Sequence, residues 1–153
     1  MKYLSLFLVI TFAISASCTA MKDGKPTIKQ GIYGKVIWQE GNMMPSPDAP
    51  SGKTGKPVSR KLRIYELTKM SEVTGNSPLF TTNSAKLIAE TTANEEGNFQ
   101  CKLNPGSYSI FTVEPDGFLF GNLFNGKGEI MAFEVKEEQL TQLNIYINYK
   151  AAF

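Results

Sequence analysis

The chain has 153 residues, of which 42% are hydrophobic and 20% are charged, a composition typical of one globular domain. Its net charge of +2 is too small to indicate a nucleic-acid partner, because phosphate binding requires clustered Lys and Arg side chains. The absence of histidine excludes Ser-His and Cys-His nucleophile pairs, HExxH zinc helices and imidazole bases. We therefore expect a non-enzymatic protein without cofactor or metal. An enzyme that uses carboxylates alone is the remaining catalytic alternative.

The N-terminus has the layout of a secretory signal peptide over residues 1–17. Met1 and Lys2 form a positive region, residues 3–14 are apolar, and small residues follow up to Cys18. The apolar run is too short for a membrane-spanning helix, which needs about 20 such residues. The small residues before Cys18 resemble the lipobox of bacterial lipoproteins, with Ser15 where the box usually has Leu. This resemblance implies lipid attachment at Cys18 and an envelope location, expected at the outer membrane and facing the periplasm or the surface. Plain secretion is the alternative.

Residues 18–29 are polar and predict a tether between the lipid anchor and a domain over residues 30–153. In that domain Cys101 alternates with apolar neighbours in the segment 99–103, which places it in the core. No disulfide framework is expected.

The domain reads as about seven short strands with period-2 alternation of apolar residues. The expected strands are 31–39, 58–68, 86–92, 98–103, 107–114, 131–135 and 143–149. The segment around 86–92 also has helical spacing, but the adjacent Thr91 and Thr92 favour a strand. We expect this strand to pair with 99–103 through a hairpin turn at Glu95–Asn98.

The separators between these strands are turn signals, such as Gly97 and the pair Pro105-Gly106. Two segments, 40–57 and 69–85, are predicted to be long loops. Many short strands joined by turns predict a single all-β sandwich rather than a βαβ sheet.

Several turn and core motifs occur in an order that resembles the carboxypeptidase regulatory-like domain. They are Gly31-x-x-Gly34-x-Val36, Gly55-Lys56-Pro57-Val58, Asn94–Phe99 and Leu103–Tyr108. This resemblance covers residues 30–149 and implies a transthyretin-like Greek-key sandwich. It also implies an accessory, binding or assembly role, and it carries no catalytic site onto this chain. The expected partners are the membrane, through the lipid anchor, and an envelope protein.

An unusually apolar segment, residues 116–126, contains the candidate partner or ligand residues Phe118, Phe120, Leu123 and Phe124. They either plug one end of the core or form an exposed platform. Because large exposed apolar patches are rare on monomers, we expect a plug, above all for Phe118. A carbohydrate- or peptide-binding surface protein is the alternative function, and the single tryptophan, Trp38, would report ligand binding by its fluorescence.

Overall fold

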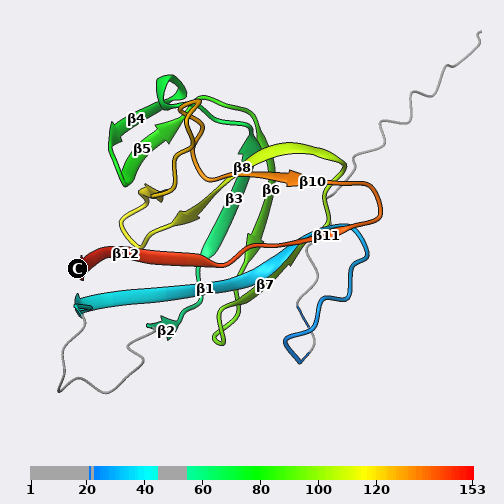
Figure 1. Cartoon of the computed structure of the whole chain (residues 1–153), viewed down its shortest axis with the longest axis horizontal. Helices are drawn as coiled ribbons and strands as arrows, with labels where there is room; N and C mark the ends of the chain where they lie inside the picture. Colours follow the sequence, from blue (N-terminus) through cyan, green and yellow to red (C-terminus); the bar gives the residue numbers. More distant parts are fainter. Residues whose placement is uncertain (1–20, 22, 45–54) are drawn as a thin grey trace, which may run out of the picture.

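The computed structural model describes residues 21, 23–44 and 55–153. This part of the chain is an all-β sandwich of two sheets (Figure 1), which confirms the predicted fold class. Its only helical turn is the short 3₁₀ element η1 (Met70–Glu72). Within the described ranges no helix is long and apolar enough to span a membrane. The predicted signal peptide, Cys18 and the first part of the tether lie outside the described residues.

The first sheet is built around one long central strand. Its strands are β1 (Gly31–Asn42), β2 (Lys56–Pro57), β7 (Asn98–Cys101), β11 (Leu140–Gln142) and β12 (Ile145–Ala152). The strands β11 and β12 pair in parallel with successive parts of one edge of β1, in one register as far as Trp38, and the register shifts by one residue between Trp38 and Glu40. The strands β7 and β2 pair antiparallel with its other edge.

The second sheet contains seven strands and runs steeply across the first in Figure 1. They are β3 (Lys61–Glu66), β4 (Val73–Asn76), β5 (Leu79–Asn83), β6 (Leu87–Thr92), β8 (Gly106–Val113), β9 (Leu119–Phe120) and β10 (Ala132–Val135). Their order is β4-β5-β9-β8-β3-β6, and β10 also pairs with β8.

All seven predicted strands are present, as β1, β3, β6, β7, β8, β10 and β12. The segment with ambiguous spacing is the strand β6, with Ala89 and Thr91 buried. The prediction of a long loop over 69–85 is wrong, because this segment contains η1 and the hairpin of β4 and β5. In that hairpin only Phe80 is fully buried, so the alternation that marks a half-buried strand is weak.

The predicted pairing of 86–92 with 99–103 is wrong. Strand β6 pairs with β3 in the second sheet, whereas β7 pairs with β1 in the first. The turn between them is closed by hydrogen bonds from the Asn94 amide to the Asn98 carbonyl and from the Asn98 amide to the Asn94 side chain. The turn residues determine that the chain reverses direction here. Packing in the core determines which strand each of the two strands pairs with.

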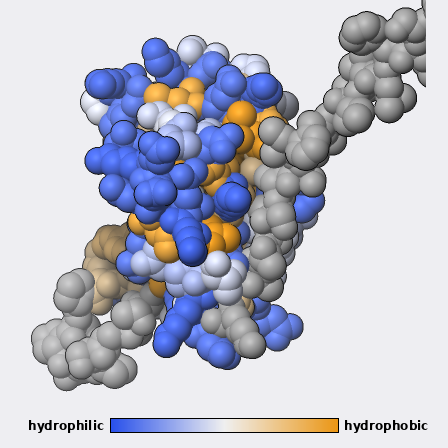
Figure 2. Space-filling model, turned by 90° about the vertical axis from the view of Figure 1, so that its right-hand side faces the viewer, coloured by the Kyte–Doolittle hydropathy of each residue, from blue (hydrophilic) through white to orange (hydrophobic). Residues whose placement is uncertain are grey.

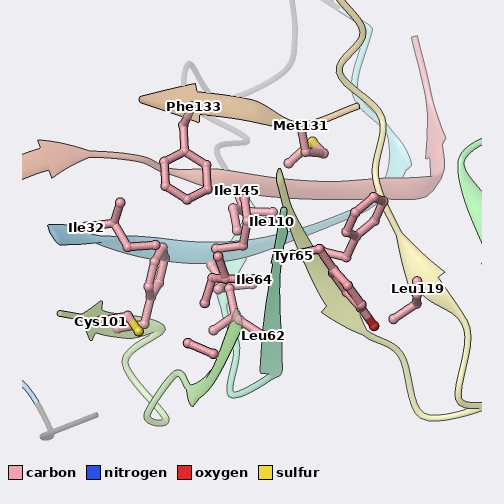
Figure 3. Packing of buried hydrophobic residues seen from close by; sticks show 14 of the residues in the cluster. Ile32, Leu62, Ile64, Tyr65, Cys101, Ile110, Leu119, Met131, Phe133 and Ile145 are labelled. Atoms are coloured by element: carbon pink, nitrogen blue, oxygen red, sulfur yellow. The ribbon is translucent and has the colours of Figure 1, made fainter. Parts of the chain in front are cut away.

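The main core lies between the sheets. In Figure 3, Ile32 and Ile145 of the first sheet point toward Ile64 and Ile110 of the second, with Cys101 at one side. All five are fully or almost fully buried, so Cys101 lies in the core, as predicted. The period-2 alternation predicted for the strands places every second residue inward in three of them, where the following residues are buried: Phe99, Cys101, Leu103, Met131, Phe133, Val135, Ile145 and Ile147.

The second sheet is also covered on its other face. There Phe111 contacts Tyr65 and Phe80 edge-on, with ring centres 5.8 and 6.2 Å apart. The chain after β3 crosses this face, where the Thr68 amide donates to the Ser109 hydroxyl and the Thr68 carbonyl accepts from the Ile130 amide. Burial on both faces explains why the consecutive residues Ser109–Thr112 of β8 are all buried.

The outer surface is mixed in character. On the face shown in Figure 2, apolar residues form separate patches that polar residues interrupt. Exposed apolar side chains therefore do not form one continuous surface on this face.

Candidate interaction site

The four candidate residues of the segment 116–126 do not form one surface. Phe120 is 0% exposed and packs against Tyr149 of the first sheet, with ring centres 5.7 Å apart. Phe118, Leu123 and Phe124 are 37%, 57% and 44% exposed. Phe120 therefore fills the core and is removed from the candidate partner residues.

The prediction that Phe118 plugs the end of the core is wrong, because Phe118 is partly exposed. The Glu114 amide donates to the Phe118 carbonyl, and the Gly117 amide donates to the Glu114 carbonyl, which closes a tight turn between β8 and β9. The paired part of this hairpin ends at Val113 and Leu119, so Phe118 lies beyond the last pair. The plug is instead formed by Leu119 and Phe120, which are buried on opposite faces of the sheet.

Leu123 and Phe124 form an exposed apolar pair, which we call the apolar pair. It borders a surface hollow of about 140 Å³ that Asn125, Glu129 and Ala132 complete. This volume is close to that of a cavity known to hold one benzene ring, about 150 Å³. The hollow is open to solvent and has about the size of one side chain, and its lining is apolar at Leu123, Phe124 and Ala132 and polar at Asn125 and Glu129.

The backbone that carries the apolar pair is fixed at several points. The Leu123 carbonyl accepts from the Met131 amide at 2.8 Å, and Phe124 forms a bridge with Ile130. The Asn125 side chain closes the following turn by accepting from the amides of Lys127 and Glu129. These bonds hold the pair in position, so its exposure is a feature of an ordered loop.

Next to this loop the backbone adopts a conformation that non-glycine residues rarely use. Met131 has φ = +47° while its side chain is 4% exposed. Such positions cost about 1–3 kcal/mol and persist where the surrounding structure imposes them, often at functional sites. The strained residue is the one whose amide holds Leu123.

The structure also shows a polar cluster that the sequence did not indicate. The Glu114 side chain is only 2% exposed, and its carboxylate accepts from the Thr112 hydroxyl at 2.8 Å and from the Tyr149 hydroxyl at 3.0 Å. Arg60 pairs with it at 3.4 Å. These four residues come from three distant segments, so no local pattern in the sequence marks them.

The burial and the charges of this cluster change the pKa of Tyr149. Its pKa is raised to about 12, mainly because burial disfavours the charged phenolate. The hydrogen bond to Glu114 and the negative charge of that carboxylate raise the pKa further, whereas the Arg60 charge lowers it.

Trp38 adjoins the same cluster. Its ring contacts Tyr149 edge-on, with centres 5.2 Å apart. The Arg60 guanidinium and the Lys150 ammonium lie 5.6 and 5.8 Å from the ring centre, within the range of cation–π attraction.

The N-terminal segment is bound to the body earlier than the predicted domain boundary at residue 30. The Thr27 amide donates to the Gln100 side chain, whose own amide donates back to the Thr27 hydroxyl. Gln30 bridges the Leu103 carbonyl and the Glu138 amide. An open cleft of about 660 Å³ lies beside this segment. The folded unit therefore includes Thr27, and the predicted tether over 18–29 is shorter at its domain end.

Comparison of the chain with protein-family models, with curated proteins and with solved structures returned no match. Within the described ranges, no three Cys, Asp or Glu side chains are placed to hold a metal ion.

Proposed function

We propose that this chain is a non-enzymatic, lipid-anchored accessory protein of the cell envelope that binds another envelope protein through the apolar pair Leu123 and Phe124. The observation that supports this most is the exposure of two large apolar side chains on an ordered loop beside a hollow. A free monomer gains nothing from holding them in water. Full burial of a large apolar side chain contributes about 1.5–3 kcal/mol, and a partner that covers Leu123 and Phe124 gains about half of this for each, because each is about half exposed.

The fixed loop also favours binding through a low entropic cost. Ordering a mobile side chain or loop reduces affinity, and this loop is already held by Met131, Ile130 and Asn125. We expect one partner side chain in the hollow, with its apolar part on the apolar pair and Ala132, beside the polar Asn125 and Glu129 that complete the lining.

The proposed anchor would keep the domain close to its membrane. With Cys18 lipidated and Thr27 bound to the body, only residues 19–26 separate the two. Eight extended residues span at most about 30 Å. The partner would then be another protein at the same membrane surface. The likeness to carboxypeptidase regulatory-like domains supports the accessory role and rests on turn and core motifs alone.

Photocrosslinking in intact cells tests this function. A benzophenone amino acid in place of Phe124 is expected to give one discrete crosslinked product. The same group in place of Leu87, which is equally exposed at 45% but lies on β6, is the matched control and should give none. No product at Phe124, or an equal yield of the same product at Leu87, would argue against a partner surface at the apolar pair.

A further inference from the structure

The surroundings of Trp38 contain three positive side chains that come from separate segments. Lys56 is directly opposite Trp38 in the antiparallel pair of β1 and β2, so both side chains project from the same face. Arg60 precedes β3, and Lys150 lies on β12. We propose that this is a binding site for an acidic saccharide, with Arg60 as the main carboxylate receptor. None of its residues belongs to the apolar pair.

Arg60 is already oriented for such a role. Its Nε faces Glu114 and its Nη1 donates to the Ser59 carbonyl at 3.0 Å, while Nη2 has no hydrogen-bond partner among the described residues. Its side chain is 20% exposed, whereas Glu114 is buried and held by two hydroxyl groups. A guanidinium fixed on one side presents its remaining donors to a carboxylate without losing much rotational freedom.

The carboxylates of the cluster leave the positive groups available to a ligand. The Glu114 carboxylate already accepts hydrogen bonds from Arg60, Tyr149 and Thr112. Glu40 is opposite Lys150 in the strand register, but no ion pair within 4 Å joins them in the described structure. Lys150 lies over the Trp38 ring instead.

The class of ligand follows from how the charges are spread. Three cations on separate segments around one indole fit a ligand that carries several anionic groups on a stiff chain. An oligosaccharide of uronic acids has this chemistry, because each ring bears one carboxylate, which would draw the exposed Lys150 ammonium away from the indole. The C–H face of the sugar ring would then pack on the indole in place of Lys150. Arg60 matches the planar carboxylate, and the lysines contribute less directional charge.

Fluorescence titration of the full chain tests this site, since Trp38 is the only tryptophan. Trigalacturonic acid is expected to change the Trp38 emission in a saturable way, and added salt should weaken the binding. Neutral trigalactose should have no effect. A glutamate tripeptide supplies carboxylates without sugar rings, and if it binds as tightly as trigalacturonic acid the saccharide assignment is overturned.

Variants locate the site. Arg60→Gln and Lys150→Gln should each weaken binding of trigalacturonic acid about tenfold or more, whereas Arg63→Gln should leave it unchanged. Arg63→Gln is the matched control because it removes the same charge from a residue three positions along the chain. Arg63 is paired with Glu90 at 2.7 Å and does not belong to the proposed site. Arg60→Gln leaves Glu114 buried without its cation and can impair folding, so Lys150→Gln at the exposed position decides that case. Absence of any saturable change in the wild type, or equal weakening by all three variants, overturns the proposal.

Discussion

Tyr149 and Glu114 join the two sheets through a hydrogen bond of 3.0 Å. Because the pKa of Tyr149 is about 12 in the folded protein and about 10 in an unfolded chain, the unfolded state loses this proton first as the pH rises. The contribution to stability is therefore complete below pH 10 and is lost between pH 10 and about 12. A shift of this size corresponds to at most about 2.7 kcal/mol, less what solvent screening removes.

The Tyr149→Phe variant should lack this loss. We expect it to be less stable than the wild type by about 1–3 kcal/mol at pH 8, because a hydrogen bond to a buried carboxylate is removed. Its free energy of unfolding should then fall less than that of the wild type between pH 10 and 12. Denaturant titrations at pH 8, 10 and 12 measure both effects, and parallel pH curves for the two proteins would contradict the assigned role of Tyr149.

Phe118 and Phe120 offer a direct comparison of two rings in one segment. Phe120→Ala should destabilise the protein by about 3–5 kcal/mol, because it leaves a cavity beside Tyr149. Phe118→Ala should cost less than about 1 kcal/mol, since the Phe118 ring is partly exposed at the turn. Chemical unfolding of both variants is the measurement, and losses of similar size would mean that the turn between β8 and β9 is wrongly placed.

The packing of β1 against the last strands depends on Gly34. A Cβ atom at this position would lie 1.9 Å from the Leu143 carbonyl oxygen, where only backbone movement can make room. We expect Gly34→Ala to destabilise the protein by about 3 kcal/mol or more. Gly126→Ala is the control, because nothing lies within 4 Å of its added Cβ, and it should change the free energy of unfolding by less than about 0.5 kcal/mol. Equal stability of the two variants would contradict the register between β1, β11 and β12.

At the level of elements, the sequence predicted strands well and their partners poorly. Alternation identifies a half-buried strand such as β10 or β12, because one face meets the core and the other meets water. It does not identify β9, a two-residue strand buried on both faces, or the hairpin of β4 and β5, in which little is buried. The partner of a strand depends on contacts far along the chain, which explains the wrong pairing of β6 with β7.

In the candidate sites too, the sequence predicted local features and missed those that depend on contacts far along the chain. An apolar segment near residue 120 was visible in the sequence, but its separation into a buried Phe120 and an exposed Leu123 and Phe124 depends on the turn and on Met131. The Glu114 cluster could not be predicted, because Arg60, Glu114 and Tyr149 are brought together by the crossing of the two sheets.

For the whole molecule, the proposed lipid anchor determines where the domain acts. Cys18→Ala should release the protein from the membrane fraction, because stable anchoring needs more than one acyl chain and this residue would carry them. Detergent phase partitioning of the wild type and the variant measures the effect. A Cys18→Ala protein that still partitions with the wild type would exclude a lipid anchor at this residue.

In the proposed function, the apolar pair binds a partner and does not stabilise the fold. The most direct test is the mass of the complex extracted from membranes in mild detergent, compared between the wild type and a Leu123→Ser, Phe124→Ser double variant. We expect the variant to migrate as the chain alone while its free energy of unfolding changes by less than about 1 kcal/mol. A complex of unchanged mass, or a loss of about 3 kcal/mol or more in the free energy of unfolding, would mean that the apolar pair does not bind the partner or that it belongs to the core.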